Sequence, residues 1–106
     1  MDAKAAPALF DAAHFDMMTG GDRTLQAEIA ALFRAREAEW RVLFAPAHPG
    51  ESWRDGAHTL KGSARGIGLW ALAEACAAAE AAAAEAPALE ALNRALDAAL
   101  GALDAY

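Results

Sequence analysis

Apolar residues recur along the chain at helical spacing, in segments that glycine and proline separate. The pattern predicts a short helix over residues 7–18 and a long second helix that Asp22 caps. The first helix is expected to bury Leu9, Phe10, Ala13 and Met17. The second is expected to bury a stripe of near-heptad spacing, Leu25, Ile29, Leu32, Arg36, Trp40 and Leu43, with Phe33 and Phe44 beside it.

Three further helices are expected after the proline- and glycine-containing segment 46–50, which cannot continue a helix. They cover about residues 52–65, residues 69–85 and a last stretch from Pro87 with Leu89, Leu92, Leu96, Leu100 and Leu103. Short connections between amphipathic helices imply antiparallel neighbours. We therefore predict an all-α fold, an antiparallel up-and-down four-helix bundle with a short additional N-terminal helix, in a single domain over residues 1–106.

Composition narrows the classes of protein that fit this pattern. Much of the hydrophobic content is alanine and β-branched residues are few, which favours helices over a sheet. The formal net charge of -6 argues against a nucleic-acid partner. The sequence contains no run of about 18 uncharged apolar residues, so we expect no membrane span. One cysteine allows no internal disulfide, which fits the reducing cytoplasm. We also expect a monomer that has no membrane partner.

The segment AHTLKGSARGIGLW, residues 57–70, carries the candidate chemistry. On a helical wheel the apolar stripe of this helix is formed by Trp53, Ala57, Leu60, Ala64 and Ile67. His58 lies roughly 140° from the centre of that stripe, on the polar side. The imidazole of His58 is therefore expected to be exposed.

The neighbours of His58 on this face suit a reactive imidazole. Gly62 follows at i+4, where a side chain would crowd one flank of the ring, and glycine costs roughly 1 kcal/mol relative to alanine in a helix. Lys61 at i+3 places a cation within reach of a group on the ring. Arg65 and Arg54, one turn beyond and one turn before, extend the positive strip. The pattern indicates a helix in which a residue of low helix propensity, Gly62, leaves a nucleophile exposed.

These residues resemble the histidine phosphotransfer (HPt) domain family. His58-x-x-Lys61-Gly62, followed by small residues and by Gly68 ten positions after the histidine, matches its core pattern. The resemblance spans about residues 8–104. It implies a helical bundle that carries a phosphoryl group on one histidine within a multistep phosphorelay of two-component signal transduction, exchanging it with aspartates of receiver domains. It also implies no kinase activity of its own, and the sequence has no P-loop.

The resemblance assigns roles to three of these residues. His58 is the expected phosphoacceptor, Lys61 a phosphoryl stabiliser, and Gly62 the position that gives access to the histidine. Arg54 and Arg65 are added from the helical wheel alone, for partner docking. The implied partners are response-regulator receiver domains, a hybrid histidine kinase, or both. No cofactor or metal site is expected, and Mg²⁺ is expected only in the partner receiver domain.

Other interpretations stay open at this stage. A helical interaction module that is never phosphorylated could use the same face, and a hydrolase is a more distant alternative because no nucleophile, base and orienting group occur together. The chain length suits a free-standing phosphocarrier, although a piece of a larger hybrid kinase has the same length. We expect His14 and His48 to be ordinary residues and Cys76 a core residue. The acidic residues after position 70 are expected to form a solvated face.

Overall fold

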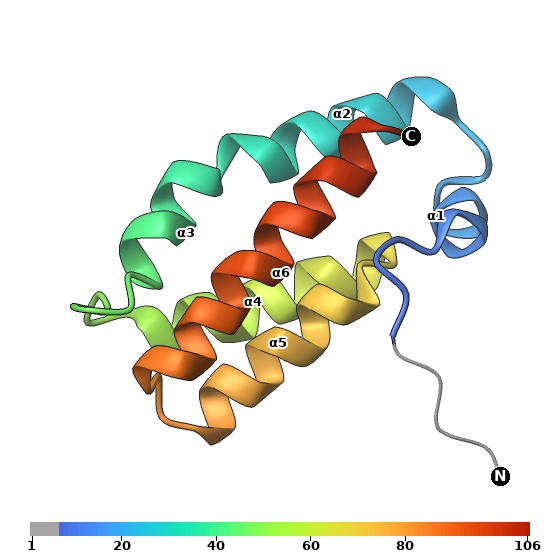
Figure 1. Ribbon diagram of the computed structural model, residues 1–106. Coiled ribbons are helices and arrows are strands. Elements are labelled where there is room, and N and C mark those ends of the chain that lie inside the picture. Colours follow the sequence, from blue (N-terminus) through green and yellow to red (C-terminus); the bar gives the residue numbers. More distant parts are fainter. Residues whose placement is uncertain (1–6) are drawn as a thin grey trace, which may run out of the picture.

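Helices make up the regular structure of residues 7–106, the part of the chain that the computed structural model describes. Residues 1–6 of the expected 1–106 domain lie outside the described residues. In order, the elements are α1 (Ala12–Thr19), α2 (Arg23–Ala35), α3 (Glu37–Leu43), α4 (Trp53–Ile67), α5 (Trp70–Ala81) and α6 (Ala86–Asp104). Since α2 and α3 are interrupted only at Arg36, they act as one interrupted helix that packs with α4, α5 and α6 (Figure 1). This bundle, with α1 at one end, confirms the predicted all-α class.

The predicted core faces of α4 and α6 are confirmed. On α4 the side chains of Ala57, Leu60, Ala64 and Ile67 are buried, and the predicted Trp53 is half-buried against the core. On α6 the buried side chains include all five predicted leucines, Leu89, Leu92, Leu96, Leu100 and Leu103. Both faces meet α5, which lies between them in the chain and contributes Leu72 and Cys76 to the same cluster. Within the described residues, no helix is long and apolar enough to cross a membrane.

The expected face of the first helix was wrong. Asp11 caps α1, because its carboxylate accepts a hydrogen bond from the backbone N–H of His14 at 3.0 Å, so the helix begins at Ala12 rather than near residue 7. Its buried side chains are Phe15 and Thr19. Of the residues expected inside, Leu9 and Met17 are 49% and 70% exposed and Ala13 is also exposed, whereas Phe10 is half-buried against the core.

The buried stripe of the second helix agrees with the predicted one at Trp40, and the predicted Ile29 and Leu43 are half-buried against the core, but the predicted Leu25, Leu32 and Arg36 are exposed. Gln26 and Phe33 of α2 and Trp40 of α3 face the core. Gln26 can occupy a core position because its side-chain amide donates hydrogen bonds to Asp16 at 2.7 Å and to Thr19 at 2.9 Å. The heptad leucines Leu25 and Leu32 consequently point outward, 40% and 70% exposed. Near the middle of the segment, Arg36 has φ −91° and ψ 0°, which interrupts the helix.

The helix expected over residues 69–85 ends earlier, at Ala81. Ala83 and Ala84 have positive φ angles of 50° and 58°. The backbone N–H of Ala84 donates to the carbonyl of Ala79 at 2.9 Å, which closes the helix and lets the chain reverse into α6. The alanine run contains no glycine or proline, so its sequence carries no signal for this stop.

Gly68 builds the corner between α4 and α5 and ties α1 to it. Its φ of +96° ends α4 in the left-handed conformation, and its carbonyl accepts a hydrogen bond from the Asp11 N–H at 2.8 Å. A Cβ here would lie 2.9 Å from the Asp11 carbonyl oxygen, so glycine is required for the close approach as well. The Trp70 indole N–H donates to the Asp11 carboxylate at 3.0 Å, which lowers the pKa of Asp11 together with the His14 N–H. This corner fixes the position of α4 relative to α5.

A polar cluster joins the last residue of the chain to the α1–α2 junction. The Tyr106 hydroxyl donates to the Asp16 carboxylate at 2.7 Å, and the Gln26 amide donates to the same oxygen at 2.7 Å. These two hydrogen bonds lower the pKa of Asp16. Arg23 contacts both Asp16 and Tyr106 from the start of α2. The cluster therefore ties the C-terminus of the chain to the junction between α1 and α2.

Acid should weaken the fold through Asp16. A carboxylate whose pKa is lower in the folded state than in the unfolded state stabilises the fold above its ordinary pKa. That contribution is lost as pH falls through the lowered folded pKa. We expect Asp16→Asn to show a smaller drop in the urea unfolding midpoint between pH 6 and pH 2.5 than the unmodified chain. Asp55→Asn, at an exposed position of α4, is the control, and an equal pH dependence in all three proteins would contradict the role of Asp16.

Candidate functional site

The candidate nucleophile lies on the exposed face of α4. The side chain of His58 is 75% exposed, while Ala57 and Leu60 beside it in the sequence are fully buried. This follows from the 3.6-residue period, which turns His58 away from the stripe that packs on the core. The predicted direction of His58 is therefore confirmed.

One flank of the helix surface next to His58 lacks side chains. A Cβ built on Gly62 would meet no atom within 4 Å, and the same holds for Gly66. Because these glycines follow His58 at steps of four residues, they leave a bare strip that winds along α4 from the imidazole. Neither glycine has the positive φ that would require glycine for backbone reasons. Their shared effect is open space beside the ring.

Lys61 does not extend freely toward His58. Its ammonium Nζ lies 2.7 Å from Oε1 of Glu80 on α5, and the two side chains are only 16% and 19% exposed. The other carboxylate oxygen of Glu80, Oε2, lies 3.9 Å from Nδ1 of His58. A single carboxylate thus faces both the ammonium and the imidazole. Glu80 was expected on a solvated acidic face, and the structure instead places it in the site.

The two arginines assigned to docking from the helical wheel are both exposed on α4. The guanidinium of Arg54 lies over the Trp53 ring, 4.7 Å from the ring centroid, which holds it at the start of the helix by a cation–π contact. Arg65 lies on the last turn. With His58 between them, they place positive charge at both ends of the exposed face.

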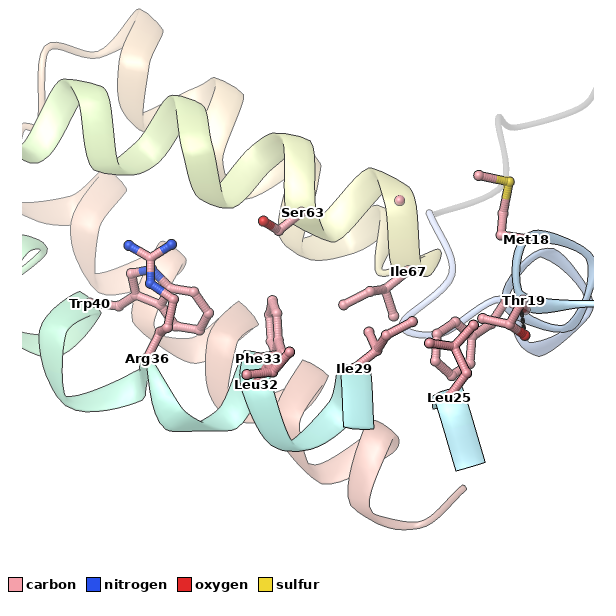
Figure 2. A pocket seen from close by; sticks show the side chains of 12 residues that line it. Met18, Thr19, Leu25, Ile29, Leu32, Phe33, Arg36, Trp40, Ser63 and Ile67 are labelled. Carbon is pink, nitrogen blue, oxygen red and sulfur yellow. Dashed lines mark hydrogen bonds between the residues drawn. The ribbon is translucent and has the colours of Figure 1, made fainter. Parts of the chain in front are cut away.

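A groove of about 420 Å³ runs between α2 and α4 on the side of the bare strip (Figure 2). Its walls are mostly apolar, and Ser63, Gly66 and Ile67 supply its α4 side. The α1 and α2 side includes Met18, Leu25, Ile29, Leu32 and Arg36. Met18 is 59% exposed and Leu32 is 70% exposed. The leucines that were predicted to be core residues therefore form the rim of a surface groove.

The remaining candidate groups do not form a second reactive site. Burial raises the pKa of the Cys76 thiol to about 12, so the thiol stays protonated at neutral pH, as befits the core residue expected. His48 is exposed in the loop before α4, and His14 is half-buried against the Trp70 ring. No group of three His, Cys, Asp or Glu residues within residues 7–106 could hold a metal ion.

Comparison with known proteins identifies the family. The model of the Hpt domain family matches residues 23–106, which include α2 to α6 and therefore His58, Lys61, Gly62 and Glu80. The chain belongs to the Hpt domain family. As an Hpt domain it is a histidine phosphotransfer domain, whose general role lies in phosphorelays and whose partners are other phosphorelay components.

A solved structure resembles this Hpt domain over nearly its whole length. The crystal structure of the histidine phosphotransferase ShpA from Caulobacter crescentus aligns with a TM-score of 0.77 and 39% sequence identity. The alignment covers 93% of this chain and 90% of ShpA. A comparison of the sequence with curated proteins gives no match.

Proposed function

We propose that this Hpt domain is a phosphocarrier of a multistep two-component phosphorelay. His58 accepts a phosphoryl group from a receiver-domain aspartate and passes it to another receiver domain. The main support is the 75% exposed imidazole beside the open space at Gly62, in a chain of the Hpt family. The relative ShpA is named a histidine phosphotransferase, which supports the same reaction class. In this proposal residues 1–106 act as one domain in the cytoplasm.

The proposed reaction uses the outer nitrogen of the ring. Nδ1 of His58 faces Glu80, so Nε2 is directed away from the helix pair and can approach a phosphorus atom. Its lone pair forms the N–P bond while the O–P bond of the aspartyl phosphate breaks, and that electron pair stays on the aspartate carboxylate. Such transfer depends mainly on in-line positioning and on charge stabilisation. The exposed ring and the bare strip provide room for the approaching domain.

In this proposal Lys61 acts in the chemistry, whereas Arg54 and Arg65 act in docking. Lys61, one turn from His58, stabilises the phosphoryl charge once its ammonium turns from Glu80 toward the ring. Arg54 and Arg65 lie further along the exposed face and attract an acidic partner surface, an effect that salt screens. The chain is expected to need no metal of its own, because the receiver domain holds the Mg²⁺.

The α2–α4 groove is proposed as the surface on which the receiver docks. Exposed leucine and methionine side chains at its rim are unusual for a solvated helix and typical of a protein interface. The groove adjoins the bare strip through Gly66, so a domain seated in it lies close to His58. Docking on α2 would then position the aspartate over the imidazole.

A charge on the groove rim should weaken docking and leave the chemistry intact. Leu32 is 70% exposed, so Leu32→Glu should change the free energy of unfolding by no more than about 0.5 kcal/mol. We expect the half-saturating receiver concentration in single-turnover transfer to rise about tenfold, because an apolar contact is replaced by a desolvated charge. The rate at saturating receiver should stay within about twofold.

Val42→Glu provides the matched control for this experiment. Val42 is 68% exposed on α3 and does not line the groove. A similar rise in half-saturating concentration for both variants would show that net charge, rather than the groove, controls docking. An unchanged value for Leu32→Glu would remove the groove from the interface.

The proposed function is tested by following phosphate onto the chain. A panel of purified receiver domains, each phosphorylated with labelled acetyl phosphate and Mg²⁺, is mixed with the protein. We expect label to move to the chain as an acid-labile, base-stable phosphate. The groove also supports the alternative of an interaction module that is never phosphorylated. Binding of receivers without any transfer of label would favour that alternative over a phosphocarrier.

A further inference from the structure

Glu80 occupies a position that phosphorylation of His58 must disturb. Its carboxylate holds the Lys61 ammonium at 2.7 Å through one oxygen and faces Nδ1 of His58 at 3.9 Å through the other. The ion pair is more than four-fifths buried, whereas the imidazole is mostly exposed. The cation expected to stabilise a phosphoryl group is therefore already engaged when the histidine carries none.

The ion pair is held in place by two helices rather than by flexible loops. Lys61 lies on α4 and Glu80 on α5, and these helices pack side by side through Leu60, Ala64 and Cys76 of the core. Burial reduces the screening of the pair by solvent, so its attraction is stronger than that of an exposed surface pair. The other charged groups of α4 near His58, Arg54, Asp55 and Arg65, are exposed.

We propose that Glu80 sets the phosphoryl-transfer equilibrium of His58 by competing with the phosphoryl group for the Lys61 ammonium. The inference rests on the proposed function, in which His58 carries the phosphoryl group. A phosphoryl group brings about −1.5 to −2 charges to Nε2. Lys61 can then neutralise that charge only by leaving Glu80, or by dividing its hydrogen bonds between the two anions.

This competition acts on the stability of the phosphorylated histidine. Glu80 thus destabilises the loaded histidine relative to the empty one. The consequence is a phosphoryl group that is readily passed on.

The test measures the equilibrium between a phosphorylated receiver and this chain at pH 8. Glu80→Gln keeps the shape of the side chain and removes its charge. We expect the equilibrium ratio of phosphorylated to free His58 to rise about fivefold, the scale of a partly shielded ion pair. In a Lys61→Ala background the same substitution should change the ratio by less than about twofold, because the contested cation is gone. Glu74→Gln, an exposed position on the same helix, should have no effect.

A spectroscopic readout separates this role from a structural one. In the phosphorylated protein, the ³¹P titration midpoint of the phosphoryl group should fall in Glu80→Gln, since a released Lys61 favours the dianion. It should stay unchanged in Glu74→Gln. An unchanged or reversed equilibrium in Glu80→Gln overturns the inference, as does a full-sized shift in the Lys61→Ala background. If the unmodified chain accepts no phosphate at all, the proposed function fails instead.

Discussion

His58→Gln should accept no phosphate from any receiver domain, while the bundle folds as before. Glutamine offers no ring nitrogen with a nucleophilic lone pair, so the N–P bond cannot form. Because the replaced side chain is 75% exposed, the free energy of unfolding should change by no more than about 0.5 kcal/mol. Label transfer measures the loss of phosphate acceptance. Thermal unfolding, monitored by circular dichroism, measures the stability of the variant.

His48→Gln is the natural control for this substitution. His48 is exposed in the loop before α4, so its variant should take up label like the unmodified chain. Label on His58→Gln at an undiminished level would show that another residue accepts the phosphate. A loss of label in both variants would contradict the assignment, because the effect would then not be specific to His58.

Gly62→Leu should block transfer without weakening the fold. Glycine inside a helix is less favourable than leucine by up to ~1 kcal/mol, and a Cβ at Gly62 meets nothing within 4 Å, so the variant should melt at an equal or higher temperature. The leucine side chain would occupy the space beside the imidazole and hold the receiver out of line. We expect transfer to slow by at least ~100-fold, because small misplacements of reacting groups have effects of that size.

Gly101→Leu is the control that separates the gain in helix stability from the loss of transfer. Gly101 is an exposed position on α6 whose added Cβ also meets nothing within 4 Å, so it should give the same gain in helix stability and normal transfer. Gly62→Ala should fall between, because its single methyl group fills less of the space. Transfer by Gly62→Leu at the rate of the unmodified chain would mean that the glycine does not serve access to His58.

The exposed face of α4 could be predicted because one helix carries all the information needed. The five apolar residues of its stripe define the buried side, and the direction of His58 follows from its angle to them. Gly62 and Lys61 follow from their spacing along the same helix. Such local geometry depends little on the rest of the fold.

Features that depend on a second helix could not be predicted from residue spacing within one helix. Glu80 lies in an alanine-rich helix with almost no amphipathic pattern, so nothing in its own segment shows that it faces α4. The stripe of α2 was misplaced because Gln26 is polar and yet buried, satisfied by partners on α1. The two leucines of α2, Leu25 and Leu32, which point away from the core, were the available signal for the groove.

The site and the groove differ in how far apart their parts lie in the sequence. His58, Lys61 and Glu80 all belong to α4 and α5, consecutive helices joined at Gly68, so the reactive group is complete once this hairpin has formed. The groove also needs α2, which is contributed by a more distant part of the chain. Substitutions on α2 can therefore alter which receiver is recognised while the hairpin keeps the chemistry unchanged. This division would allow duplicated copies of such a chain to diverge toward separate signalling partners without passing through an inactive intermediate.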